Sequence, residues 1–271
     1  MPCEKPRCRQ FLRATLLAGG LAATLPCVAE GQTAASSDPP SLFGDSWRVE
    51  LGANVGLRPV YPGATRYGPM AAPDITLSYR HRVTLGREGL SLNILSVPGL
   101  ALGPMIGLMD GRDHKDSARL NGMGDIQPSL ALGAFVRWQH GPFSIRATVR
   151  QAATHSRNGL KATLGGEWRT PIASDLTLAL GPDLNFGNGR YEQTWFGVTQ
   201  AQAARSGLPA YHAGGGLQDA GAHIRLTWQA TPRWQFRTFA GFSQLLLDAA
   251  GSPIVQRQTM LMGGVGAGYR F

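Results

Sequence analysis

The densest group of residues that could bind a cation or carry acid–base chemistry lies in "MDGRDHKDSARLNGMGD", which contains Asp110, Asp113, His114 and Asp116. Carboxylates and imidazoles serve as metal ligands and as acids and bases in hydrolases. A calcium-binding EF-hand loop needs acidic residues at alternate positions, a glycine and a distal glutamate, and this segment lacks that spacing. We therefore expect a solvated loop and no metal site, with weak cation binding as the alternative.

A second candidate for catalysis is the adjacent pair His155 and Ser156. In membrane-barrel lipases a histidine activates a serine two residues away, since residues at that spacing share one face of a strand. Adjacent residues face opposite sides, and the Asn-Gly that follows here is typical of a turn. His212 and His223 also lack a partner at metal-ligand spacing. The sequence thus indicates no catalytic residue, metal or cofactor, and we expect that the protein is not an enzyme.

Arginine is the charged residue that recurs in a regular pattern. In "DITLSYRHRVTL" and "RWQHGPFSIRATVR" polar and apolar residues alternate along most of the segment. A period of two is typical of strands with one apolar and one polar face. A soluble core could not bury so many unpaired charges, whereas the wet lumen of a barrel can. We expect seven arginines to line such a lumen: Arg80, Arg82, Arg137, Arg146, Arg150, Arg225 and Arg237.

The alternating segments are long enough to cross a bilayer, for which a tilted strand needs about 9–11 residues. Tryptophans at 47, 138, 168, 228 and 234 lie on the apolar face near segment ends, as in an aromatic girdle. The sequence therefore predicts an all-β fold, a transmembrane antiparallel up-and-down β-barrel of twelve strands. Ten is the alternative, because 89–109 could be one bent strand and 190–199 is weakly patterned. The expected strands are 46–58, 73–85, 89–97, 100–109, 127–139, 142–152, 159–169, 175–186, 190–199, 219–230, 233–246 and 258–271.

The first 29 residues have a different character. A positively charged start precedes a short apolar stretch and the small residues that signal peptidase requires, and the stretch is too short for a membrane helix. We expect a signal peptide at 1–29, a disordered lead-in at 30–45 and the barrel at 46–271. All three cysteines fall in the leader, which leaves the barrel without a thiol. The net charge of +9 is dispersed, which argues against nucleic-acid binding.

The last alternating segment ends with Tyr269 and Phe271 on its apolar face. In a closed barrel the last strand pairs with the first, so the chain can end with a complete strand. A terminal aromatic residue resembles the signal by which outer-membrane barrels are recognised for assembly. We therefore expect the barrel-assembly machinery as a partner, and outer-membrane lipid and lipopolysaccharide around the folded barrel.

Several motifs resemble the MipA/OmpV family of outer-membrane proteins. "VYPGATRYGPMAAPDITLSYR" resembles the first loop and second strand of that family, and "LNGMGDIQPSLALGAF" resembles its Leu-x-Gly-x-Gly-Asp-Ile segment. The most specific match is "YEQTWFGVTQAQAARSGLPAYHAGGG". Its loop motif comprises Tyr191, Phe196, Gly197, Val198, Ser206, Gly207, Leu208 and Tyr211.

The resemblance implies an outer-membrane barrel without enzymatic activity. Some members of the family are linked to peptidoglycan machinery as a scaffold for a lytic transglycosylase and a synthase, and others are described as porin-like. We expect a structural or scaffolding role in the cell envelope. The alternative is a small-solute or anion-selective porin, since inward arginines favour anions in an open lumen. For the long connection 199–216 the alternatives are folding inward, binding a partner, or forming an ordered surface loop.

Overall fold

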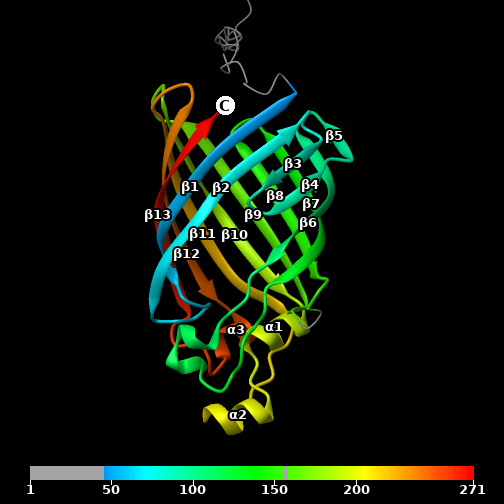
Figure 1. Cartoon of the computed structure of the whole chain (residues 1–271), viewed down its shortest axis with the longest axis vertical. Helices are drawn as coiled ribbons and strands as arrows, with labels where there is room; N and C mark the ends of the chain where they lie inside the picture. Colours follow the sequence, from blue (N-terminus) through cyan, green and yellow to red (C-terminus); the bar gives the residue numbers. More distant parts are fainter. Residues whose placement is uncertain (1–45, 156–157) are drawn as a thin grey trace, which may run out of the picture. The chain divides into compact units, whose positions relative to one another are not determined.

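The computed structural model describes residues 46–155 and 158–271, so the expected signal peptide and lead-in lie outside the described residues. The described chain forms one antiparallel sheet that closes into a barrel (Figure 1). β4 and β5 both pair with β6 as one interrupted strand, which gives a twelve-stranded barrel. The strands are β1 (Trp47–Pro59), β2 (Tyr67–Tyr79), β3 (Val83–Gly86), β4 (Gly89–Leu92), β5 (Leu95–Val97), β6 (Leu100–Met109), β7 (Ser129–His140), β8 (Phe143–Ala152), β9 (Leu160–Pro171), β10 (Leu176–Gly187), β11 (Gly216–Gln229), β12 (Trp234–Leu245) and β13 (Thr259–Arg270).

The barrel closes where the first strand meets the last. β1 pairs with β13 from Glu50 opposite Arg270 to Leu57 opposite Gly263. On the far side of β1, the sheet runs through β2, β3 and β4 to β6. The prediction of an all-β, antiparallel, twelve-stranded barrel is confirmed. Of the helices in the described part, none has the length and apolarity to cross a membrane.

Two of the expected strands are wrong. The segment 73–85 divides into β2 and β3, because Arg80 and His81 adopt positive φ and form a tight turn closed by a hydrogen bond from Arg82 N to Tyr79 O (2.9 Å). Two consecutive positive φ angles define a type I′ hairpin turn, which glycine or asparagine usually signals. The segment 190–199 is mostly helical, as α1 (Gly189–Phe196). The two errors cancel in the count, since one strand is gained and one is lost.

The alternation of side chains separates lipid from lumen. Large apolar residues on one parity of the strands are exposed, although soluble proteins rarely leave so many on one continuous surface. The tryptophans at 47, 138, 168, 228 and 234 all lie near the strand ends that meet the short turns, so they gather at one end of the barrel. Further members of the exposed face are Leu51, Val55, Leu57, Leu132, Val149, Ile224, Phe236 and Val265.

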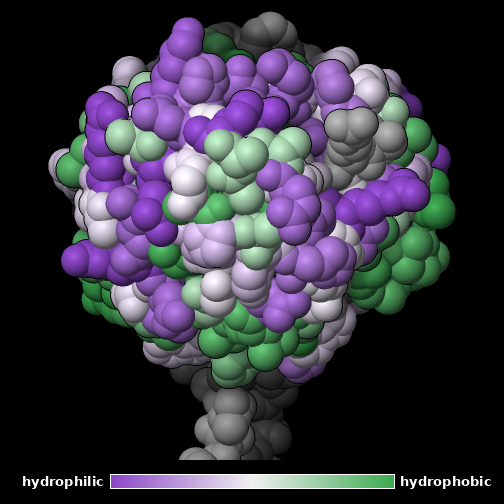
Figure 2. Space-filling model, turned by 90° about the horizontal axis from the view of Figure 1, so that it is seen from below, coloured by the Kyte–Doolittle hydropathy of each residue, from purple (hydrophilic) through white to green (hydrophobic). Residues whose placement is uncertain are grey.

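The two ends of the barrel differ in their connections. Short turns at 80–82, 98–99, 141–142, 172–175 and 230–233 occupy the end where β1 begins and β13 ends. The opposite end carries long loops, which hold all of the helices in the described residues (Figure 1). Figure 2 views this end, and hydrophilic residues cover most of it. The helices are η1 (His114–Asp116), η2 (Ala118–Leu120), α1 (Gly189–Phe196), α2 (Gln200–Ser206) and α3 (Leu247–Gly251).

One part of the wall lacks a complete ladder. β3 pairs with β2 over Leu77–Tyr79 alone, so within the described chain β2 from Tyr67 to Thr76 pairs only with β1. Pro69 and Pro73 lie in this stretch at positions of the same parity. Proline has no N–H, so it removes donors that would otherwise face lipid without a partner. The wall beside β2 is therefore an edge that prolines protect.

Candidate functional site

The lumen contains linked ion pairs. Arg237 on β12 binds Glu50 on β1 and Asp74 on β2. Because these residues come from both ends of the chain, the pairs connect strands on either side of the β1–β13 closure. Two carboxylate partners offset part of the cost of removing the Arg237 guanidinium from water, although its Nε has no partner among the described residues.

A second network lies on the neighbouring strands. Arg225 on β11 binds Glu167 on β9, and His223 Nδ1 lies 2.5 Å from Asp183 Oδ2 on β10. Glu167 also lies 3.5 Å from His223 Nε2 and 2.8 Å from Arg169. The two networks neutralise much of the positive charge that the inward arginines would otherwise present to a passing solute.

The other five predicted arginines have different surroundings. Arg137 on β7 stacks 4.5 Å from the Phe135 ring centroid, and Arg146 on β8 lies 3.3 Å from Glu88. Arg150 lines the cavity described below. Arg80 and Arg82 lie in the turn between β2 and β3. Because this turn is at the end of the barrel, the strand alternation does not place their side chains in the lumen.

The acidic partners are the site residues that sequence reasoning did not select. Glu50, Glu167 and Asp183 share the polar parity of their strands with the arginines, so the alternation does identify them as inward-facing. Which acid meets which arginine depends on strand register, and the pattern of one strand contains no information about its neighbour. Asp74 and His223 share that parity on β2 and β11, so they too are identified as inward-facing but not as partners.

Four loops pack together and close one mouth of the barrel; we call this assembly the cap. It comprises residues 60–66, 110–128, 188–215 and 246–258. Two groups of buried apolar side chains hold it together. One contains Met109, Ile126, Ala131, Ala152, Tyr191, Trp195, Phe196, Ala213, Leu245 and Ala249. The other contains Tyr61, Ala64, Leu120, Met123, Val198, Leu208 and Ile254.

Hydrogen bonds between loops also fix the cap. Each joins a side chain of one loop to a main-chain carbonyl of another, so the bonds depend on tertiary packing. Buried hydrogen bonds of this kind give a loop assembly a single arrangement. They run from the Tyr61 hydroxyl to Ile254 O (3.1 Å), Arg112 Nη1 to Trp195 O (2.7 Å), Gln202 Nε2 to Met123 O (2.7 Å) and the Ser252 hydroxyl to Phe196 O (2.5 Å).

The predicted loop motif forms the centre of the cap. Tyr191 and Phe196 are buried on α1, and Gly197 ends that helix. Val198 and Tyr211 exchange two main-chain hydrogen bonds of 2.8 Å, which fold the loop back on itself. Gly207 ends α2 with φ 73°, a conformation that suits glycine. Leu208 is buried beside Val198, and the Ser206 hydroxyl accepts from Leu208 N (3.2 Å).

Two charged residues are buried in the cap, and neither was selected from the sequence. Arg112 is 5% exposed, and burial lowers its pKa to about 10. Its guanidinium lies 5.9 Å from the Trp195 ring centroid, and its Nε has no partner among the described residues. Burial, reinforced by Asp219, raises the pKa of Glu192 on α1 to about 8, so this carboxyl is mostly protonated at pH 7.

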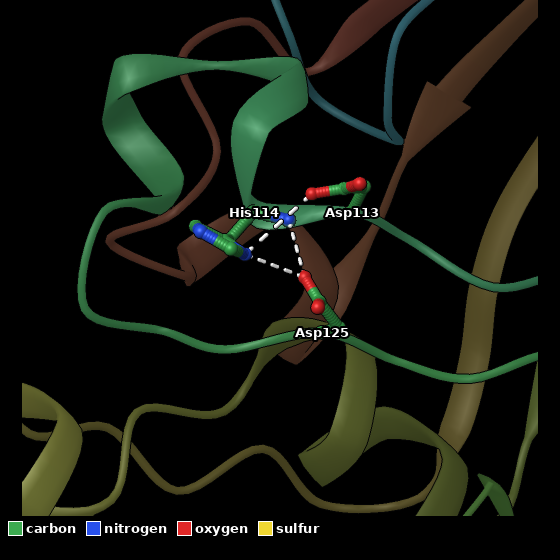
Figure 3. Close-up of side chains that lie close together, drawn as sticks. All are labelled: Asp113, His114 and Asp125. Atoms are coloured by element: carbon green, nitrogen blue, oxygen red, sulfur yellow. Dashed lines mark hydrogen bonds and ion pairs between the residues drawn. The ribbon is translucent and has the colours of Figure 1, made fainter.

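The acidic segment that contains Asp110, Asp113, His114 and Asp116 lies on the cap. Asp113, His114 and Asp125 approach one another there (Figure 3). Asp125 Oδ1 accepts from the His114 main-chain N (2.8 Å) and lies 2.6 Å from its ring Nδ1, and the main-chain bond is the largest cause of a lowered Asp125 pKa. Asp113 Oδ1 accepts from Lys115 N (2.8 Å). These bonds stabilise the loop.

The remaining candidates lie outside this assembly. His155 is in the β8–β9 loop with its Nδ1 3.4 Å from the Thr154 hydroxyl, and Ser156 lies outside the described residues. Tyr269 and Phe271 contact each other edge to face with ring centroids 4.8 Å apart. Trp234 lies 5.0 Å from Tyr269, so the end of the chain joins the aromatic residues at the short-turn end.

A closed barrel with an apolar exterior, aromatic residues grouped at one end and charge inside defines a membrane-spanning β-barrel of the outer-membrane type. The family model described as MltA-interacting protein MipA matches residues 51–271, and the chain belongs to that family. No curated protein matches the chain by sequence.

Three solved structures show a weak similarity to this chain. The NanC porin is 10% identical with a TM-score of 0.44, over 82% of this chain and 100% of that one. The COG4313 outer membrane channel from Pseudomonas putida F1 is 10% identical with a TM-score of 0.43, over 83% and 96%. OprB of Pseudomonas putida is 11% identical with a TM-score of 0.39, over 73% and 49%.

Proposed function

We propose that the protein is a structural barrel of the outer membrane that docks a peptidoglycan-remodelling enzyme and does not conduct solutes. The cap is the observation that carries this proposal. Its two apolar cores fill the mouth at the long-loop end, and Phe196, Leu120 and Ile254 are almost inaccessible there. A porin needs a continuous aqueous path, which a packed apolar core obstructs.

The connections suggest which end meets the partner. Outer-membrane barrels have short turns on the periplasmic side and long loops outside. By this rule the cap faces outward, and the short-turn end faces the periplasm and its peptidoglycan. The five short turns carry Arg80, Arg82 and Arg233 and one acid, Asp175. A basic rim is suited to an acidic surface on the partner, and it gives Arg80 and Arg82 a docking role in place of a lumenal one.

The family description supplies the class of partner. It names MltA as the protein with which the family interacts. We infer a lytic transglycosylase as the enzyme that this chain docks, with a peptidoglycan synthase as a further component. The barrel then supplies position at the membrane, and the partner supplies the chemistry.

Binding of a purified lytic transglycosylase to the folded barrel tests this proposal. The double variant R80E/R82E should weaken binding at least about tenfold, since charge reversal on a rim replaces attraction with repulsion. R190E reverses an exposed charge on the cap and should leave the affinity unchanged. Affinity lost in R190E and retained in R80E/R82E would assign docking to the opposite end.

Planar-bilayer recording tests the porin alternative. The folded native barrel should be silent, because the cap closes one mouth. Stepwise, anion-favouring conductance that changes in R146Q, R150Q or R237Q would replace the docking proposal with a channel.

A further inference from the structure

A cavity of about 450 Å³ lies in the lumen against the cap. Arg150 on β8 and Lys161 on β9 both line it, and they lie directly opposite each other in the β8–β9 ladder. Like charges at opposed positions on one face of a sheet repel each other. This pair therefore raises the free energy of the empty barrel unless negative charge lies close to both groups.

The lumen holds a second pair of opposed cations, and neighbouring groups stabilise the positive charge of that pair. Arg137 and Arg146 face each other across β7 and β8. Glu88 lies 3.3 Å from Arg146, while Arg137 donates to the Ser91 hydroxyl (3.3 Å) and stacks on an aromatic ring. The second pair thus shows how the barrel normally accommodates such a juxtaposition.

Arg150 and Lys161 have no comparable partner. Within the described chain neither forms an ion pair with a carboxylate. Arg150 Nη1 makes one long hydrogen bond to Leu108 O (3.5 Å), and the Lys161 ammonium lies 5.9 Å from the Tyr191 ring centroid. Arg58 adds a third cation to the lining of the same cavity.

The acids nearby offset the positive charge of this pair only in part. Asp219 accepts from Asn185 Nδ2 and Gln218 Nε2, both at 2.9 Å, and Asp183 is bound to His223. Glu192 is mostly protonated at pH 7, and Asp110, the other acid of the lining, is exposed to solvent. Asp219 and Asp110 attract Lys161 across the cavity without forming an ion pair. With Asp183 paired to His223, the three cations Arg58, Arg150 and Lys161 face two carboxylates, so positive charge is in excess.

We propose that Arg150 and Lys161 bind an oxyanion, either a phosphate or a carboxylate group, in this cavity. A guanidinium presents a planar fork of donors to two oxygens, and an ammonium adds a compact charge at a third position. Tyr191 and Trp195 also line the cavity and offer aromatic surface to the rest of the ligand. The site lies apart from the basic rim, so it does not depend on docking of an enzyme.

Two sources can supply the oxyanion. A soluble anion can reach the lumen through water. A membrane amphiphile can present its headgroup beside β2, because the outer edge of that strand is unpaired from Tyr67 to Thr76. The recognised chemistry is the same in both cases.

The test uses the scarcity of lysine. Beyond residue 45 the chain has two lysines, Lys115 on the cap and Lys161 in the cavity. Reductive methylation with ¹³C-formaldehyde keeps their charge and gives each a separate NMR signal, which Lys115→Arg assigns. The folded barrel in dodecyl maltoside is titrated with inorganic phosphate, sodium acetate and dodecyl phosphate, and with sodium chloride at equal ionic strength.

We expect the Lys161 signal to shift and saturate, while the Lys115 signal changes as it does with chloride. Saturation with phosphate or acetate identifies a free solute, and saturation with dodecyl phosphate alone identifies a lipid headgroup. R150Q should weaken binding at least about tenfold, because a charged hydrogen bond is lost. R146Q, which removes a paired lumenal arginine, should leave it unchanged.

Either of two results overturns the proposal. One is a Lys161 signal that follows chloride with all three probes. The other is saturable binding that persists unchanged in a folded R150Q barrel. If R150Q does not fold, R150K keeps the charge and removes the planar fork, and it should give weaker but saturable binding.

Discussion

Replacing Glu192 by glutamine should make the stability of the cap nearly independent of pH. Glu192 is 2% exposed, and neither carboxylate oxygen has a hydrogen-bond partner among the described residues. Its pKa of about 8 in the closed cap compares with 4.5 when the group is solvated. Below pH 4.5 the carboxyl is protonated in both the closed and the open cap. Between pH 4.5 and 8 only the open cap loses its proton, so the closed cap loses stability as the pH rises, and the loss levels off above pH 8.

The difference in pKa sets the size of the effect. A rise from 4.5 to about 8 corresponds to at most roughly 5 kcal/mol. The open cap keeps part of the low-dielectric surroundings of the barrel mouth, so we expect about 1–3 kcal/mol between pH 5 and pH 8. Glutamine has the same shape and no charge, which removes this dependence.

Hydrogen exchange measures the opening of the cap directly. The amides of Val198 and Tyr211 are bonded to each other's carbonyl at 2.8 Å and exchange only when the loop opens. Comparing E192Q with the native chain at one pH cancels the intrinsic exchange rate. The two should exchange alike at pH 5, and E192Q should exchange about tenfold more slowly at pH 8, as about 1.4 kcal/mol implies.

A matched control comes from the β3–β4 hairpin. E88Q removes a carboxyl outside the cap. The exchange rates of the Val198 and Tyr211 amides in E88Q, divided by those in the native chain, should therefore be the same at both pH values. If the ratio of exchange rates between E192Q and the native chain is also the same at pH 5 and pH 8, the reasoning is refuted. Ionisation of Glu192 would then not be coupled to closure of the cap.

Three further predictions address the cap, the lumen and the end of the chain. F196A removes a side chain that is 1% exposed, which should cost about 3–5 kcal/mol and allow channel openings in planar bilayers where the native barrel is silent. R237Q leaves Glu50 and Asp74 without their cation and should lower the melting temperature of the folded barrel, and adding E50Q and D74N should restore it. F271A should lower the amount of barrel inserted in the outer membrane of cells, with the stability of the refolded protein changed by less than about 1 kcal/mol; equal insertion with and without the aromatic would contradict an assembly role.

Most of the strands could be predicted because the barrel wall imposes a strict period of two. The expected segments 127–139 and 142–152 differ from β7 and β8 by at most two residues at any end. The β2–β3 turn was missed because Arg80 and His81 are not residues that usually adopt positive φ. The helix α1 was missed because it lies in a loop, where tertiary packing of Tyr191 and Trp195 decides the local structure.

The sequence by itself determined which side chains face lipid and which face the lumen, because successive residues of a strand point to opposite faces. It also predicted arginines on the polar face of several strands. Only the tertiary structure decided that Arg237 meets Asp74, 163 positions away, since register and closure bring distant strands together. It alone decided that one mouth is closed and that, among the described residues, Arg150 and Lys161 form no ion pair, because both outcomes depend on contacts between segments far apart in the chain.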